Sequence, residues 1–245
     1  MTFVEETQVV ILAGGLGKRL RPYTETIPKP LIEISEKPFL EYKLNQLRNF
    51  GTKKILLCVG YLGEKIEEYF KDGKDFGLDI KYSYEKELLG TAGAIKLAES
   101  LIETNPFIVM NGDTYLNFDI AKLNEDESSK IIMVVANATN PLEQELVEIE
   151  RDTITNFHQR GTLNHQACLK NPSTLLINGG VYRFRKEIFQ SIPEGRVCSL
   201  EKEIFPRFLG EIKGIRYRGY VKDLANIQFC KELEDDLISG AGYDS

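Results

Sequence analysis

The chain has 245 residues, of which 42% are hydrophobic and 28% charged, a composition typical of a soluble globular protein that is long enough to bury a sizeable core. A net charge of −6 argues against a general nucleic-acid binder, which would carry a basic face. No apolar run approaches the ~18 residues of a membrane span, and Met1 to Thr7 lack the apolar core expected of a signal sequence. We therefore expect a cytoplasmic protein that binds neither nucleic acid nor membrane, with free thiols at Cys58, Cys168, Cys198 and Cys230.

The first half of the chain alternates between strands and helices. Short β-branched apolar runs predict buried strands, and apolar residues three and four apart predict helices. The expected strands are 9–12, 54–60, 80–84 and 107–110, and the expected helices are 38–50, 63–70 and 91–101. This order is typical of a doubly wound α/β layer, a parallel sheet with helices on both faces, which binds ligands beyond the carboxyl ends of its strands.

Beyond residue 125 the expected elements are shorter and partly antiparallel. They are strands at 131–136, 175–184 and 214–218, an antiparallel pair at 146–149 and 153–157, helices at 186–192, 200–209 and 227–238, and a loop over 159–174. The glycines at 179 and 180 interrupt their strand, which indicates a bulge or a close approach of a ligand. Since no linker, repeat or low-complexity stretch divides the chain, we expect a single domain over residues 1–245.

The most informative stretch is Gly-Gly-Leu-Gly-Lys-Arg at 14–19, directly after the first strand. Three glycines in four positions allow a ligand to approach the backbone closely, and successive N–H groups form a concavity that suits phosphate. Arg19, Arg21 and Lys29 bring cations to the same place. A dinucleotide fingerprint would need glycine at Leu20, and a P-loop would need Ser or Thr at 19, so neither motif fits.

The pattern Gly-Gly-x-Gly-x-Arg, followed by Pro28-Lys29-Pro30, resembles the signature of the sugar-1-phosphate nucleotidyltransferases, which make NDP-sugars. The resemblance runs from Gln8 to the last helix and is closest to short guanylyltransferases acting on mannose 1-phosphate or D-glycero-D-manno-heptose 1-phosphate. It implies that NTP, with GTP favoured, and a sugar 1-phosphate react to give an NDP-sugar and pyrophosphate. It also implies a Rossmann-like, doubly wound mixed sheet with a small antiparallel sugar-binding region, residues 1–125 forming the nucleotide-binding core and 126–245 the sugar-phosphate part and closing helix.

The resemblance also implies roles for individual residues. Arg19 would stabilise charge on the phosphates, and Lys29 would bridge toward the α-phosphate or the sugar phosphate. The segment Glu85 to Ala94 matches the family's segment against the base and ribose, with Leu88 where the family usually has proline; Thr91 would also cap the helix that begins there. The expected nucleotide-binding residues are Leu12, Ala13, Gly14, Gly15, Gly17, Lys18, Arg19, Glu85, Leu89, Gly90 and Thr91.

Two aspartates are candidate ligands for Mg²⁺, the expected cofactor. Asp113 follows the strand at 107–110 and reaches the same sheet edge as the glycine loop, where Mg²⁺ would take one or two carboxylates plus phosphate oxygens. A lone aspartate at a strand end is otherwise a turn former or helix cap. The family's second carboxylate matches Asp223, although the chain has Ala-Asn-Ile at 225–227 where the family commonly has Gly-Thr-Pro. Together with Arg19 and Lys29, Asp113 completes the expected catalytic set.

The sugar side and the choice of base follow less directly. Asn178 and Glu201 match polar positions of the family's sugar pocket, although a glutamate at a helix start also favours the helix dipole. The expected substrate-binding residues are Asn111, Asn178, Gly180 and Glu201. Guanine presents N1–H and N2–H donors, and a carboxylate only accepts, so Glu85 or Glu87 suits guanine. A backbone contact from Leu89 or Gly90 could serve any base.

Other functions stay open at this point. A cytidylyl-, uridylyl- or thymidylyltransferase acting on another phosphorylated acceptor is the nearest alternative. A non-catalytic nucleotide-sugar sensor would be expected to lack a metal carboxylate or the loop arginine, all of which are present here. An NAD-binding oxidoreductase is remote because the third glycine is missing. The acidic composition and the family likeness permit a homodimer.

Overall fold

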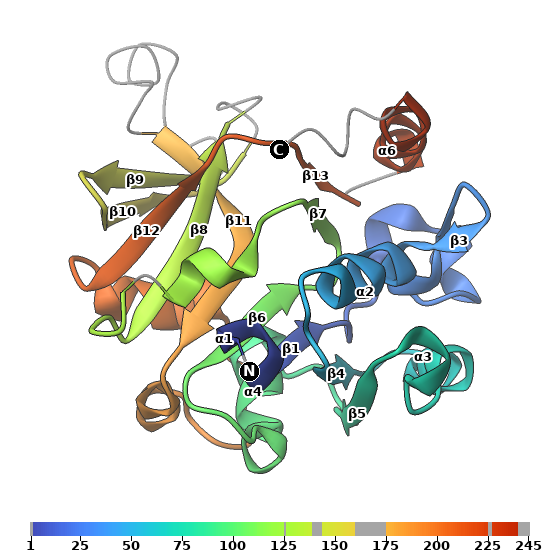
Figure 1. Ribbon diagram of the computed structural model, residues 1–245, viewed down its shortest axis with the longest axis horizontal. Coiled ribbons are helices and arrows are strands. Elements are labelled where there is room, and N and C mark those ends of the chain that lie inside the picture. The colour runs from blue at the N-terminus through green and yellow to red at the C-terminus, as the bar shows by residue number, and fades with distance from the viewer. Residues whose placement is uncertain (1, 125, 139–143, 160–174, 225–226, 240–245) are drawn as a thin grey trace.

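The structure is a computed structural model that describes residues 2–124, 126–138, 144–159, 175–224 and 227–239. Within these residues, one mixed sheet has nine strands in the order β5-β4-β1-β6-β11-β8-β12-β10-β9 (Figure 1). The strands in chain order are β1 (Val9–Leu12), β4 (Lys54–Val59), β5 (Asp79–Tyr84), β6 (Phe107–Asn111), β8 (Ile131–Asn137), β9 (Leu146–Glu150), β10 (Thr153–His158), β11 (Leu175–Phe184) and β12 (Ile212–Tyr217).

The parallel half of the sheet is β5-β4-β1-β6, as the sequence predicts. β1 pairs in parallel with both β4 and β6, and Leu12 lies opposite Cys58 on one side and Asn111 on the other. After β5, on one side of β1, the chain returns to β6 on the other side. The carboxyl ends of β1 and β6 therefore meet where the strand order reverses, which is where open α/β sheets bind ligands.

The second half of the chain continues the same sheet. β11 runs antiparallel to β6 and β8, while β8 and β12 are parallel, so the mixed sheet is confirmed. β9 and β10 form the expected antiparallel pair, yet they belong to the main sheet rather than to a separate one, because β10 also pairs with β12 and β9 also pairs with β11. The interruption at 179 and 180 is a shift of register in β11 between Asn178 and Tyr182, where Gly180 has φ +68°.

Helices cover both faces of the sheet, which confirms the doubly wound arrangement. α2 (Phe39–Asn49) and α3 (Gly63–Phe70) pack on one face through buried residues that include Leu40 and Ile66. α4 (Gly90–Leu97) packs on the other face through Ala92 and Ile95. The short α1 (Phe3–Glu6) adds Val4 to the first of these cores.

Three expected helices differ from the structure. α4 ends at Leu97, and a 3-10 turn follows at Glu99–Leu101. The segment Lys186–Ser191 is a 3-10 helix. The expected helix at 200–209 is a π-helical turn, Leu200–Ile204, followed by a 3-10 turn, Phe205–Phe208, because Pro206 has no N–H to continue helical hydrogen bonding.

Parts of the remaining predictions lie outside the described residues. These are the loop expected over 159–174, apart from residue 159, and Cys168. The other three cysteines are buried free thiols, as expected. In the described part of the chain, no helix combines the length and apolar character needed to cross a membrane.

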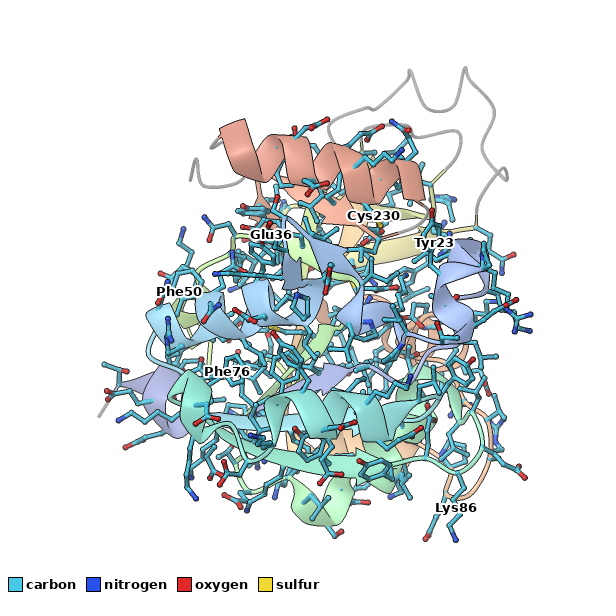
Figure 2. All side chains as sticks on the ribbon, turned by 90° about the vertical axis from the view of Figure 1, so that its right-hand side faces the viewer. Tyr23, Glu36, Phe50, Phe76, Lys86 and Cys230 are labelled. Carbon is cyan, nitrogen blue, oxygen red and sulfur yellow. The ribbon has the colours of Figure 1, made fainter. Side chains whose placement is uncertain are left out.

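Two short antiparallel pairs and the last helix lie beside the main sheet. The pairs are β2 (Glu33–Ile34) with β3 (Lys37–Pro38), and β7 (Thr114–Leu116) with β13 (Val221–Asp223). α6 (Ile227–Ser239) lies across the β2–β3 turn, where the N–H and hydroxyl of Ser35 donate to Glu234 at 2.8 and 3.1 Å (Figure 2). Cys230 of α6 packs with Leu20 and Leu224, so the helix joins the region after the glycine loop to β13.

Candidate active site

A cleft of about 390 Å³ lies at the carboxyl ends of β1 and β6, and its size falls within the range of small-molecule sites. Most of the predicted site residues line this cleft. They are Leu12, Ala13, Gly14, Gly15, Lys29, Glu85, Gly90, Thr91, Asn111 and Asp113. Sequence segments separated by up to a hundred residues are thus brought to one place by the ends of neighbouring strands.

The glycine loop is held in place by backbone hydrogen bonds that extend the sheet. The N–H of Ala13 donates to the Cys58 carbonyl at 2.8 Å, and the N–H of Gly112 donates to the Leu12 carbonyl at 2.9 Å. A Cβ at Gly112 would lie 2.4 Å from that Leu12 oxygen, so only glycine allows the two strand ends to approach this closely. The end of β6 therefore lies directly against the start of the loop.

Gly17 ends the glycine loop in a left-handed conformation, with φ +58°. A Cβ there would lie 3.2 Å from the Lys29 Cβ, so the loop packs against the segment that carries Lys29. Lys18 and Arg19 follow on an exposed 3-10 turn, Lys18–Leu20, and do not line the cleft. The contacts of Lys18 and Arg19 with phosphate therefore stay predictions, and they require that these long side chains extend toward the bound ligand.

Glu85 lies between two glycines at one end of the cleft. Its Oε2 accepts the Leu89 N–H at 2.9 Å, and a Cβ at Gly14 would lie 2.1 Å from its Oε1. A Cβ at Gly60 would likewise lie 2.8 Å from the Glu85 Cγ. Burial raises the pKa of Glu85, although the Leu89 N–H opposes that shift. Glu87, the other candidate for the base, is exposed and does not line the cleft.

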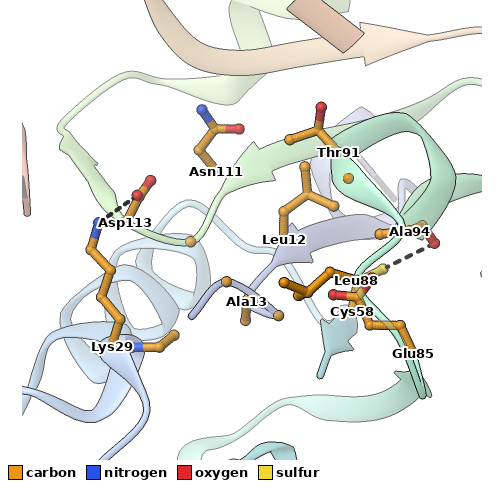
Figure 3. A pocket seen from close by; sticks show the side chains of 15 residues that line it. Leu12, Ala13, Lys29, Cys58, Glu85, Leu88, Thr91, Ala94, Asn111 and Asp113 are labelled. Carbon is orange, nitrogen blue, oxygen red and sulfur yellow. Dashed lines mark hydrogen bonds and ion pairs between the residues drawn. The ribbon is translucent and has the colours of Figure 1, made fainter. Parts of the chain in front are cut away.

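The opposite end of the cleft holds a cluster of charge. Lys29 Nζ lies 2.6 Å from Asp113 Oδ2, and Figure 3 shows this pair across the cleft from Glu85 and Leu88. Asp223 reaches the same place because β13 pairs with β7, which sets Asp223 opposite Thr114. The Leu224 N–H also donates to the Asp113 carbonyl at 2.8 Å.

Asp223 and Asp113 influence one another electrostatically. The Asp223 side chain keeps contact with solvent, but protein surrounds its site on most sides, and this burial raises its pKa. The neighbouring Asp113 carboxylate raises the pKa of Asp223 further, while the Thr114 hydroxyl and the ammonium of Lys29 oppose the shift. Two carboxylates at one sheet edge form a site that attracts cations.

This donor set fits Mg²⁺. Asp113 already accepts one cation, the Lys29 ammonium, and Mg²⁺ commonly binds one or two carboxylates with phosphate oxygens and water filling the remaining positions. Within the described residues, no group of three or more His, Cys, Asp or Glu side chains could hold a metal by itself. Asp113 and Asp223 would therefore hold the ion together with a phosphate ligand.

Lys43 is a part of this site that the sequence analysis missed. It projects from α2, is 2% exposed, and its Nζ donates to the Thr114 carbonyl at 2.6 Å. Burial lowers the pKa of Lys43 to about 8, and the charges of Asp113 and Asp223 oppose that shift. The available signal is its position three residues after Leu40, on the apolar face of the predicted helix.

The predicted sugar side forms a second group next to the cleft. Asn178 Nδ2 donates to the Tyr182 hydroxyl at 2.6 Å, and Asn178 Oδ1 accepts the Gly180 N–H at 2.9 Å. A Cβ at Gly180 would lie 2.9 Å from Asn111 Nδ2, so Asn111 of the cleft touches this group directly. Tyr182 is fully buried and was missed, because an aromatic residue in a strand reads as core.

Glu201 does not line the cleft, but it accepts a hydrogen bond at 2.9 Å from Thr91, which does. The expectation that Thr91 caps α4 is wrong. The helix begins at Gly90, and the Cys198 carbonyl accepts the N–H groups of Ala92 and Gly93 at 3.0 and 3.2 Å. Because a carbonyl takes these helix donors, the Thr91 hydroxyl is directed to other partners.

Comparison with known proteins gives the chain a family. The nucleotidyl transferase family matches residues 8–214. The D-glycero-alpha-D-manno-heptose 1-phosphate guanylyltransferase of Campylobacter jejuni is 38% identical over 88% of this chain and 91% of that protein. Two further relatives are the UTP–glucose-1-phosphate uridylyltransferase of Synechocystis and the mannose-1-phosphate guanylyltransferase catalytic subunit beta of Drosophila pseudoobscura. Each is 34% identical over 82% of this chain, and the match covers 55% of the first protein and 53% of the second.

Comparison with solved structures agrees with the comparison of sequences. The crystal structure of HddC from Yersinia pseudotuberculosis complexed with GMP-PN matches with a TM-score of 0.80 and 29% identity, over 94% of this chain and 99% of that chain. The likeness covers nearly the whole chain, and with it the strands whose ends form the cleft. The chain therefore belongs to the nucleotidyl transferase family and is an enzyme of that class.

Proposed function

We propose that the protein is a sugar-1-phosphate guanylyltransferase, which converts GTP and D-glycero-D-manno-heptose 1-phosphate or mannose 1-phosphate to the GDP-sugar and pyrophosphate. A phosphate oxygen of the sugar 1-phosphate would attack the α-phosphorus, forming a new P–O bond. The bond from the α-phosphorus to the bridging oxygen would break, and its electron pair would leave with pyrophosphate.

One observation carries the proposal. The Lys29–Asp113 pair lies at one end of the cleft that the glycine loop lines, and Asp223 interacts electrostatically with Asp113 there. A reaction between two polyanions needs this combination, because the protein must position them and offset their charge rather than form a covalent bond. The backbone at Gly14 and Gly15 faces the same cleft and would hold the triphosphate.

The charged residues would share the remaining work. Lys29 would exchange Asp113 for a phosphate oxygen, and Arg19 would reach the β- and γ-phosphates from its exposed turn. When bound at Asp113 and Asp223, Mg²⁺ would neutralise phosphate charge and polarise the reacting phosphate. Losing one such cationic contact costs roughly 10²–10³ in rate, by analogy with an oxyanion-hole donor.

The preference for GTP rests on Glu85 and on the relatives. Glu85 lines the cleft at the end opposite Lys29 and uses one carboxylate oxygen for the Leu89 N–H. A carboxylate has about four acceptor positions, so it can still accept from the N1–H and N2–H of guanine. The relative from Campylobacter is named a guanylyltransferase, and the HddC structure holds a guanine nucleotide analogue, GMP-PN.

The test is pyrophosphate release with Mg²⁺, in which GTP, CTP, UTP, ATP and dTTP are each combined with heptose, mannose and glucose 1-phosphates. We expect turnover with GTP, and its loss in Asp113→Ala. Turnover only with another nucleotide would keep the reaction class and refute the assignment of Glu85. Nucleotide binding without turnover by any pair would instead indicate a non-catalytic nucleotide-sugar sensor.

A further inference from the structure

Two side-chain hydroxyl groups converge on one oxygen of Glu201. The Thr91 hydroxyl donates to Glu201 Oε2 at 2.9 Å, and the Ser199 hydroxyl donates to the same oxygen at 2.8 Å. Within the described residues, Oε1 of Glu201 has no hydrogen-bond partner. One oxygen of this half-buried carboxylate is thus anchored, and the other is left to accept from a ligand.

We propose that Thr91 and Ser199 are positioning residues that orient Glu201 for the hydroxyls of the sugar 1-phosphate. The inference rests on the proposed function, and it moves Thr91 from nucleotide binding to the sugar side. A hydroxyl has a single donor, and Thr91 has committed its donor to Glu201. A hydroxyl-rich sugar supplies the donors that the free carboxylate oxygen can accept.

The backbone around these hydroxyls is fixed by close contacts between α4 and the segment before Glu201. The Cys198 N–H donates to the Leu89 carbonyl at 2.8 Å, and the Leu200 N–H donates to the Thr91 hydroxyl at 2.8 Å. A Cβ at Gly90, where φ is +72°, would lie 2.6 Å from the Cys198 carbonyl oxygen. The two hydroxyls therefore have defined positions before any ligand arrives, which lowers the entropic cost of binding.

Glu201 is also coupled to the other predicted sugar residues. Complete burial raises the pKa of Tyr182 and the charge of Glu201 raises it further, so the Glu201 carboxylate acts electrostatically on the Tyr182 hydroxyl. Tyr182 in turn accepts a hydrogen bond from Asn178. The anchored carboxylate is thus joined to the cleft through Thr91 and coupled electrostatically through Tyr182 to the predicted sugar group, which favours a role for its free oxygen on the sugar side.

The test is steady-state pyrophosphate release with GTP and the sugar 1-phosphate that the wild type accepts, giving a KM for each substrate. We expect Ser199→Ala and Thr91→Val each to raise the sugar KM about tenfold, since a hydrogen bond to a charged group is lost. The KM for GTP should stay within about twofold of the wild type, because neither hydroxyl serves the nucleotide. Thr91→Ser keeps the hydroxyl and should restore a sugar KM close to that of the wild type.

A double-mutant cycle separates positioning from general damage. In a Glu201→Ala background, Ser199→Ala should raise the sugar KM by less than about twofold, because the side chain that Ser199 orients is gone. Additive effects would overturn the inference, as would parallel rises in both KM values. Ser199→Ala and Thr91→Ser carry the test if Thr91→Val does not fold. No turnover by the wild type refutes the proposed function, whereas turnover with an unchanged sugar KM in the variants refutes this inference alone.

Discussion

Two neighbouring glycines of the loop should respond in opposite ways to the same substitution. A Cβ at Gly14 would lie 2.1 Å from Glu85 Oε1 and 3.3 Å from the Gly60 nitrogen, whereas a Cβ at Gly15 would meet nothing within 4 Å. Gly14→Ala must therefore displace the Glu85 carboxylate. Gly15→Ala is the matched control, because it adds the same methyl group one position further along the same loop.

The magnitude follows from what Glu85 loses. Its hydrogen bond to the Leu89 N–H involves a charged acceptor and is worth about 1.5–3 kcal/mol, part of which returns when the half-buried carboxylate regains water. We expect a net loss of about 1–2 kcal/mol in the free energy of unfolding, or a fall in Tm of about 2–8 °C for a chain of this length. Gly15→Ala should leave Tm unchanged or raise it slightly, because alanine lowers the conformational entropy of the unfolded chain, which stabilises the folded protein by about 0.4–1 kcal/mol.

Thermal unfolding of both variants without ligand provides the measurement. Combining Gly14→Ala with Glu85→Ala removes the side chain that the methyl group meets, so the first substitution should then cost less than half of its cost in the wild type. Equal Tm values for Gly14→Ala and Gly15→Ala would refute the reasoning. An undiminished cost of Gly14→Ala in the Glu85→Ala background would show that the strain comes from the backbone at Gly60 instead.

Three further predictions concern the charged end of the cleft. Since burial lowers the pKa of Lys43 to about 8, the unfolded chain binds one more proton than the native protein between about pH 8 and ~10.4. The free energy of unfolding of the wild type, measured by urea denaturation, should therefore rise across that window relative to that of Lys43→Met, by at most about 3 kcal/mol. A difference between the two proteins that does not change with pH would contradict this prediction. Lys29→Met should lower kcat/KM by a factor of roughly 10²–10³ in the pyrophosphate assay. A loss smaller than about tenfold would refute the predicted role of Lys29 in phosphate binding. EDTA should abolish turnover, and added Mg²⁺ should restore it. Asp223→Asn should need a higher Mg²⁺ concentration for half-maximal rate. If the surface variant Asp75→Asn needs an equally higher concentration, the effect is only one of net charge.

The parallel half of the fold and its glycine loop could be predicted because both depend on local sequence. The runs that became β1, β4 and β6 are short, apolar and bounded by glycines or polar residues, and the loop follows β1 directly. The ends of neighbouring parallel strands share one edge, so placing Asp113 beside the loop needed only the strand order. The structure does bring these predicted residues into one cleft.

The parts that could not be predicted depend on distant partners. Periodicity identifies β9 and β10 as strands, but it does not show that β9 also pairs with β11 inside the main sheet. The π-helical turn at Leu200–Ile204 has the same apolar spacing as an α-helix, and Thr91 resembles an ordinary helix cap until the Cys198 carbonyl takes the helix donors. The role of Lys43 could not be predicted either, because only the fold shows that the Thr114 carbonyl accepts a hydrogen bond from its ammonium group.

The continuity of the sheet limits how the enzyme can move. β11 is hydrogen-bonded to β6 on one side and to β8 on the other, so the strands that carry the glycine loop and those that carry the predicted sugar side form one continuous sheet. Swinging one half against the other, as hinged enzymes do around their ligands, would break that ladder of backbone bonds in the middle of the core. Adjustment to different substrates should instead come from surface turns such as the one that carries Arg19, while the strands that line the cleft keep the relative positions set when the chain folds.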